Sequence, residues 1–169
     1  LEDRVYVFRT ETDTEVLANL MEYIYLKGQV SAEIAVRLAL HKVIGAYGLA
    51  ILCKDEPNKM IAARRGSPLV IGVGEGEYFL ASDATPIVEH TKSVIYLNDN
   101  DVAILSRDEL VLKTIKNDKL TPKVQKLELE IGDIEKNGYD HFMLKEIFEQ
   151  PRSIKDTFRG RVNPDKDNI

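Results

Sequence analysis

The segment Thr12-Asp13-Thr14-Glu15 holds the residues of this chain best suited to binding a small cationic group. It follows a β-branched and aromatic run, Val5 to Phe8, which is predicted to end a strand, and it opens a helical pattern. Thr12 and Glu15 have the spacing of a capping box, with acidic residues at the positive end of the helix dipole. Asp13 can therefore make a charge-assisted contact to the ammonium of an amino-acid substrate. A capped helix start without a ligand explains the same residues, and the local pattern alone favours it.

The cysteine and the histidines give weaker indications of chemistry. Cys53 ends an apolar strand with Lys54 beside it, and a lone cysteine in that setting is more often a packing residue than a nucleophile. His41, His90 and His141 lie far apart and lack the spacing of metal ligands. No metal site is predicted.

Three further motifs are assigned structural roles. The run Gly72 to Gly76 resembles a phosphate-binding loop, but strand-like residues flank it on both sides, so a hairpin turn is predicted and nucleotide binding is rejected. Ser82-Asp83 with His90 could suggest a hydrolytic triad, yet no nucleophile elbow is present and coincidence is the better interpretation. Arg64-Arg65 could bind phosphate, but the pair is interpreted as a solvated strand end.

Two helices must position the Thr12 to Glu15 segment. The first has apolar residues at helical spacing after Thr12 and can end at Gly28, and Ser31 is predicted to cap the second. The apolar stripe expected on this second helix consists of Ile34, Ala35, Leu38 and Ala39. The pattern then changes to seven predicted strands: Tyr47 to Cys53, Met60 to Ala63, Leu69 to Val73, Tyr78 to Ala81, Val94 to Leu97, Val102 to Leu105 and Leu110 to Thr114.

Short connectors between these strands set the sheet type. Parallel crossovers need a dozen or more residues, so the connectors are predicted to be hairpins: Gly66-Ser67-Pro68, Gly74-Glu75-Gly76, Asn98-Asp99-Asn100 and Ser106-Arg107-Asp108. Several strands are almost continuously apolar, which indicates that both faces are covered. We therefore predict antiparallel sheet packed against helices and a second sheet.

The end of the chain is predicted to be polar and then helical. Residues 117 to 121 and 133 to 139 are predicted to be a turn and a loop. A helical pattern starts at His141, and Pro151 is predicted to start a new helical stretch that reaches Gly160.

Composition limits the function classes. The 169 residues are 44% apolar and 30% charged, as expected for one soluble domain or a piece of one. A net charge of −5 argues against nucleic acid or an anionic membrane as a partner, and no apolar run is long enough to span a bilayer. The single cysteine cannot form an internal disulfide and fits a cytoplasmic location. Because Leu1 is not an initiator methionine, we expect the true start to lie upstream.

Read in order, several segments form one series: Glu11 to Glu15, Gly45-Ala46-Tyr47-Gly48, Ala63 to Leu69, Ile71-Gly72, Ala81-Ser82-Asp83, Tyr96-Leu97, His141 to Pro151 and Gly160-Arg161. This series resembles the glutaminase domain of the isomerising glutamine–fructose-6-phosphate aminotransferases, the glucosamine-6-phosphate synthases. The resemblance covers nearly the whole chain. Its Arg-Gly-Ser-Pro-Leu and Lys-Glu-Ile-Phe-Glu-Gln-Pro stretches are specific and distinguish it from the amidophosphoribosyltransferases and asparagine synthetases.

The resemblance implies an α+β fold, a four-layer αββα sandwich of the N-terminal-nucleophile hydrolase type with antiparallel sheets. It implies hydrolysis of glutamine, with the ammonia passed to sugar-isomerase domains of the same polypeptide that convert fructose 6-phosphate to glucosamine 6-phosphate. By this resemblance Asp13 binds the α-ammonium of glutamine. No cofactor is implied, and a homo-oligomer is expected.

The sequence departs from the family pattern at the nucleophile. The family uses a cysteine at its mature N-terminus, whose own α-amino group serves as base, whereas Leu1 cannot do this and Cys53 matches no catalytic position. We therefore expect residues 1–160 to be the rear part of the domain, incomplete at its N-terminal side, and residues 161–169 to start a linker. The chain is expected to contain no catalytic residue and to be inactive alone. The alternatives are a class II amidotransferase with another acceptor and a non-catalytic binding domain.

Overall fold

The computed structural model describes residues 6–127 and 136–158, and the predicted linker 161–169 lies outside these ranges. The chain divides into two compact units, Leu1–Glu128 and Leu129–Ile169, which are described separately below. Among the described residues, no helix is long and apolar enough to cross a membrane.

Two helices open the first unit, as predicted. Helix α1 spans Asp13–Gly28 with Thr12 as its N-cap, and the chain leaves it through Gln29 in a left-handed conformation with φ of 48°. Helix α2 spans Ala32–Leu40 after Ser31. The predicted stripe of α2 was partly wrong because Leu38 is exposed, whereas Val36 and Leu40, one helical turn apart, are buried.

Within the part of the chain that the structure describes, every strand pair is antiparallel, and the seven predicted strands are confirmed. One sheet has the order β1-β2-β6-β7-β8 and the other the order β4-β3-β5-β9. The two-residue strands β8 and β9 were not predicted, because two residues carry no readable period. The strands are β1 Tyr47–Leu52, β2 Lys59–Arg65, β3 Val70–Val73, β4 Tyr78–Ala81, β5 Ser93–Tyr96, β6 Asp101–Ser106, β7 Leu110–Thr114, β8 Lys119–Leu120 and β9 Gln125–Lys126.

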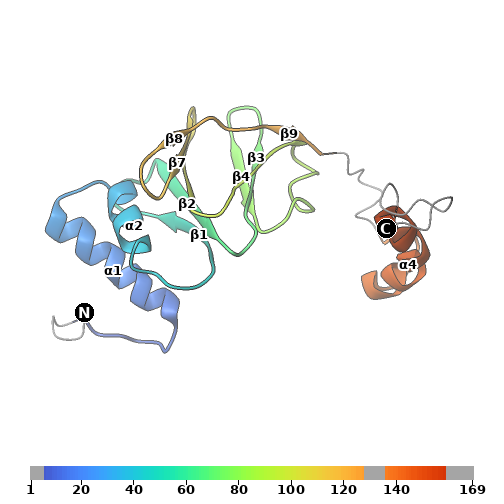
Figure 1. The fold of residues 1–169 in the computed structure, drawn as a ribbon, viewed down its shortest axis with the longest axis horizontal. Helices are drawn as coiled ribbons and strands as arrows, with labels where there is room; N and C mark the ends of the chain where they lie inside the picture. Colours follow the sequence, from blue (N-terminus) through green and yellow to red (C-terminus); the bar gives the residue numbers. More distant parts are fainter. Residues whose placement is uncertain (1–5, 128–135, 159–169) are drawn as a thin grey trace, which may run out of the picture. The chain divides into compact units, whose positions relative to one another are not determined.

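The first unit is layered, with helices α1 and α2 on one face of the five-stranded sheet and the four-stranded sheet on the other (Figure 1). One core cluster joins the helices to β1, β2 and β6 and includes Met21, Val36 and Ile61. A second lies between the sheets and includes Ile71 and Ala103. These layers confirm the α+β sandwich with antiparallel sheets.

Two of the four short connectors are not hairpins. The β3–β4 and β6–β7 connectors are hairpins, as predicted. Residues 66–69 and 97–100 instead carry the chain from one sheet to the other, since β2 and β6 belong to the five-stranded sheet and β3 and β5 to the four-stranded one. A few residues suffice for this step because stacked sheets lie only about 10 Å apart.

Polar contacts hold the two sheet-crossing connectors together. Arg64 donates a hydrogen bond to the carbonyl of Leu97 and lies 3.6 Å from the carboxylate of Asp99, which also accepts the Gly66 N–H at 2.9 Å. Asp101, only 4% exposed, accepts the Asn98 N–H at 2.7 Å. Arg64 therefore makes internal contacts, and the prediction that it is a solvated strand end was wrong.

The predicted strand at Val5 to Phe8 is wrong for its described part, because residues 6–8 form no strand. Backbone groups of a strand need a partner strand, and Tyr6 instead packs edge-on against Tyr23 of α1, with ring centroids 6.4 Å apart.

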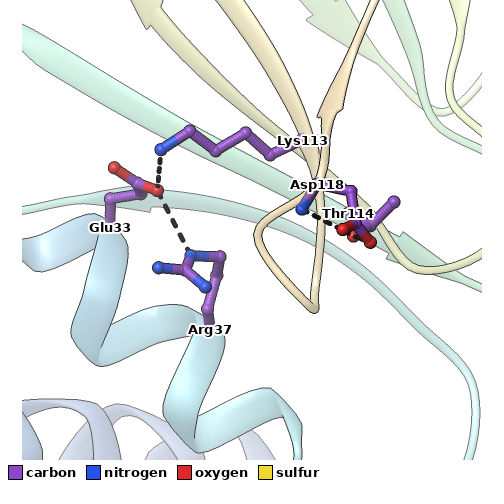
Figure 2. A network of polar contacts seen from close by, with 5 residues as sticks. All are labelled: Glu33, Arg37, Lys113, Thr114 and Asp118. Carbon is purple, nitrogen blue, oxygen red and sulfur yellow. Dashed lines mark hydrogen bonds and ion pairs between the residues drawn. The ribbon is translucent and has the colours of Figure 1, made fainter.

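An ionic network ties α2 to the five-stranded sheet (Figure 2). The carboxylate of Glu33 accepts from Lys113 of β7 at 2.7 Å and from Arg37 of α2 at 3.2 Å. All three side chains are at most 20% exposed. In the same view, Thr114 and Asp118 close the turn that follows β7.

Substituting Glu33 with glutamine is expected to destabilise the chain by about 1–3 kcal/mol, because two half-buried cations lose their shared anion. Urea unfolding measures this loss. In a double-mutant cycle with Lys113→Met, the second substitution should cost less in the Glu33→Gln background than in the wild type. Strictly additive losses would show that the ion pair contributes nothing.

Within the described residues of the second unit, 136–158, helix α4 runs from Phe142 to Phe158. The helical start near His141 is confirmed, but the predicted new stretch at Pro151 is wrong, since Pro151 lies inside the continuous helix. Lys145 is only 3% exposed and lies 3.7 Å from Glu149, and Phe148 stacks on Tyr139.

Candidate functional site

Asp13 is the first residue of α1, and its side chain is exposed. Among the described residues, its carboxylate is contacted by the Thr14 hydroxyl alone, at 3.5 Å. The neighbouring Thr12 hydroxyl is already used within the helix start, because it accepts the Glu15 N–H at 3.4 Å. The carboxylate of Asp13 is thus left open to an outside donor.

Glu15 binds back to the chain that precedes the helix. One carboxylate oxygen accepts the Arg9 N–H at 2.8 Å, and the other accepts the Thr10 N–H at 2.7 Å and the Thr10 hydroxyl at 2.5 Å. The predicted capping box is therefore half right: Thr12 caps the helix, but Glu15 reaches Arg9 and Thr10 rather than the Thr12 N–H. The role of Thr10 was not predicted from the sequence, although its hydroxyl two residues before the N-cap was the available signal.

These contacts hold the pKa of Glu15 below its ordinary value. The hydrogen bond from the Thr10 hydroxyl contributes most, followed by the Arg9 N–H, because both favour the ionised carboxylate. Glu56 is similar: its carboxylate accepts the Ala32 N–H at the start of α2, at 2.7 Å, and that bond lowers its pKa.

Stability is therefore expected to fall under acid conditions. Because both folded-state pKa values are depressed, the two carboxylates contribute their stabilisation in full above the unfolded value of 4.5, and they lose it as the pH falls through the folded values. Urea midpoints between pH 7 and pH 3 measure this, and the decrease should be smaller in the double variant Glu15→Gln, Glu56→Gln. An equal decrease in the wild type and the double variant would contradict the assignment.

A groove of about 480 Å³ lies between α1, α2 and β1. Its lining is mostly apolar and includes Leu17, Met21 and Val36, while Thr14, the neighbour of Asp13, also lines it. Cys53 and Tyr25 line the groove as well, and burial raises the pKa of Tyr25. Cys53 is half-buried and packs against the helical core, so it is mainly a packing residue, as the sequence suggested.

The other motifs have structural roles. The Asp83 carboxylate accepts the Thr85 N–H at 2.7 Å, while the His90 ring stacks on Phe79 with centroids 4.6 Å apart. The Gly72 to Gly76 run forms the β3–β4 hairpin, as predicted. Arg65 donates to the carbonyl of Val43 at 3.2 Å.

Comparison with known proteins gives close relatives. The chain is 54% identical over 170 residues to the isomerising glutamine–fructose-6-phosphate aminotransferase of Bacteroides thetaiotaomicron, covering 100% of this chain and 28% of that protein. It is 48% identical to the enzyme of the same name from Chlorobaculum tepidum, covering 97% of this chain and 27% of the relative. The corresponding protein of Thermococcus kodakarensis is 49% identical, with 92% of this chain and 26% of the relative covered. The chain thus spans about a quarter of the length of these curated relatives.

The fold also resembles a solved structure. Glutamine phosphoribosylpyrophosphate amidotransferase from B. subtilis superposes with a TM-score of 0.57 over 68% of this chain and 25% of that one, at 24% sequence identity. The likeness shows the fold alone, an α+β sandwich of the N-terminal-nucleophile hydrolase type. No protein-family model matches the chain. The sequence relatives and this fold agree: over its whole length the chain corresponds to part of the glutamine amidotransferase region of the isomerising glutamine–fructose-6-phosphate aminotransferases.

Proposed function

We propose that Asp13 binds the α-ammonium of glutamine within a glutamine-hydrolysing domain. The observation that carries this proposal is the open carboxylate of Asp13 beside two engaged neighbours, Thr12 and Glu15. A carboxylate left exposed at a helix start can make a charge-assisted hydrogen bond to an ammonium without first breaking a strong internal bond. The names of the relatives support glutamine as the substrate that carries this α-ammonium.

The whole protein is proposed to pass the released ammonia to a sugar-isomerase domain of the same polypeptide, which makes glucosamine 6-phosphate from fructose 6-phosphate. We place the domain at residues 1–160 and the protein in the cytoplasm, as a homo-oligomer. Cys53 is not assigned as the nucleophile, because it is half-buried against the helical core and follows β1. This chain contributes substrate binding to the reaction: it orients the amino-acid end of glutamine, whereas the attacking group comes from elsewhere in the protein.

The test uses the full-length protein and measures glutamate formed from glutamine, with and without fructose 6-phosphate. The proposal expects glutamate in both conditions and glucosamine 6-phosphate when the sugar is present. It also expects poor use of 4-carbamoylbutanoate, which has the same carboxamide but no α-ammonium. Absence of glutamine hydrolysis, or equal use of the two amides, would overturn the proposal.

A further inference from the structure

We infer that Glu15 and Thr10 are positioning residues for the ammonium contact of Asp13. This inference rests on the proposed function and concerns two residues that do not themselves touch the substrate. Glu15 holds the chain before the helix through three hydrogen bonds that use both carboxylate oxygens. Asp13 lies between this clamped segment and Glu15, so its backbone is tethered from both sides.

The clamp extends through the threonine side chains. The Thr10 hydroxyl lies 2.9 Å from the Thr12 hydroxyl and 2.5 Å from the Glu15 carboxylate. The Thr12 hydroxyl in turn accepts the Glu15 N–H in the first turn of α1. The loop thus closes on itself around Asp13, from Thr10 to Thr12 to Glu15 and back to Thr10.

The closed loop separates the roles of two neighbouring acids. Glu15 is committed to backbone donors, and these bonds also lower its pKa, which keeps the carboxylate ionised as an acceptor. Asp13 has one weak contact, at 3.5 Å. Because all of these groups are exposed or half-exposed, water competes for each bond, and the geometry persists only while several bonds act together. Loss of one member is therefore expected to loosen the position of Asp13.

The measured quantity is the preference of the full-length protein for glutamine over 4-carbamoylbutanoate, as a ratio of kcat/KM values. A folding defect lowers the amount of active protein and both kcat/KM values together, so this ratio reports the ammonium contact. Glu15→Ala is expected to lower the preference about tenfold, in the range for loss of a hydrogen bond to a charged group. The change should appear in the KM for glutamine, with kcat nearly unchanged. Glu15→Gln, which keeps one acceptor oxygen, should restore part of the preference.

Two further variants separate positioning from other effects. Thr10→Val removes the hydroxyl that Glu15 and Thr12 share, without changing any charge, and should lower the preference several-fold. Glu56→Gln is the matched control, because it removes a carboxylate bond to a helix N–H at the start of α2 rather than α1. It should reduce stability as Glu15→Gln does and leave the preference unchanged.

The outcomes separate the inference from the proposed function. If Asp13→Asn abolishes the preference but Glu15→Ala and Thr10→Val leave it intact, the positioning role is wrong and the proposed function stands. If only the Glu15 variants lower it, the charge of Glu15 attracts the ammonium directly and the clamp is not responsible. If Asp13→Asn itself leaves the preference unchanged, the proposed role of Asp13 fails.

Discussion

Replacement of Asp13 by asparagine in the full-length protein is expected to raise the KM for glutamine about 10- to 100-fold. Asparagine keeps the shape of the side chain but loses the negative charge, and a hydrogen bond to a charged group contributes about 1.5–3 kcal/mol. The value of kcat should change little, because the ammonium does not take part in the chemical step. Initial rates of glutamate formation over a range of glutamine concentrations measure both constants.

Glu11→Gln is the matched control for this experiment. Glu11 is also exposed and lies two residues before Asp13, so the substitution removes the same charge from the same region. Its effect on KM is expected to be less than twofold, since exposed charges are screened by water and salt. Equal effects of the two substitutions would show that Asp13 acts through general electrostatic attraction rather than direct contact.

Substituting Gly72 with valine is expected to destabilise the first unit by about 3 kcal/mol or more, or to prevent folding. A Cβ at Gly72 would lie 2.5 Å from a methyl carbon of Ile87, 3.0 Å from Thr91 and 3.2 Å from the Cβ of Phe79. Real Cβ atoms do not approach another carbon to 2.5 Å, and the two other contacts are tight, with Phe79 held by the β3–β4 pairing. Even Gly72→Ala should lower stability measurably. Urea unfolding followed by circular dichroism measures the change.

Gly48→Ala tests whether this cost is specific to Gly72. Gly48 also lies within a strand, but a Cβ there would meet only ordinary contacts, at 3.5 Å from Pro68 and Ser67. The substitution is therefore expected to be neutral or slightly stabilising, because alanine restricts the unfolded chain more than glycine does. Comparable losses at the two positions would indicate that strand glycines are needed for another reason than the space at Ile87.

The start of the proposed glutamine site shows how far local sequence information extends. Thr12 was correctly predicted as a helix cap, because capping involves groups within one helical turn. The partners of Glu15 were not predicted, since they depend on how residues 9–12 fold back on the helix. The role of Asp13 came from resemblance, and local rules alone favoured a plain cap.

The strands likewise separate what local sequence predicts from what tertiary packing decides. Their positions could be read because residue type and period are local properties, and antiparallel pairing followed from the short connectors. The assignment of strands to sheets could not be predicted, because a short connector can either turn within one sheet or cross to the facing sheet. The 66–69 and 97–100 connectors take the second path, where Arg64, Leu97 and Asp99 meet.

Segments with strong local patterns were misread wherever a distant partner decides the outcome. Residues 6–8 have strand composition, yet a strand needs a neighbour to accept its backbone hydrogen bonds, and here Tyr6 packs on α1 instead. Arg64 reads as a solvated strand end, but an acceptor 33 residues away draws it inward. Residue types and spacing thus specify the caps, the strands and the family, because these depend on neighbours along the chain. The sheet order and the buried polar contacts depend on contacts that form only when distant segments pack together. The closed loop around Asp13 is local, but it depends on how residues 9–12 fold back on the helix.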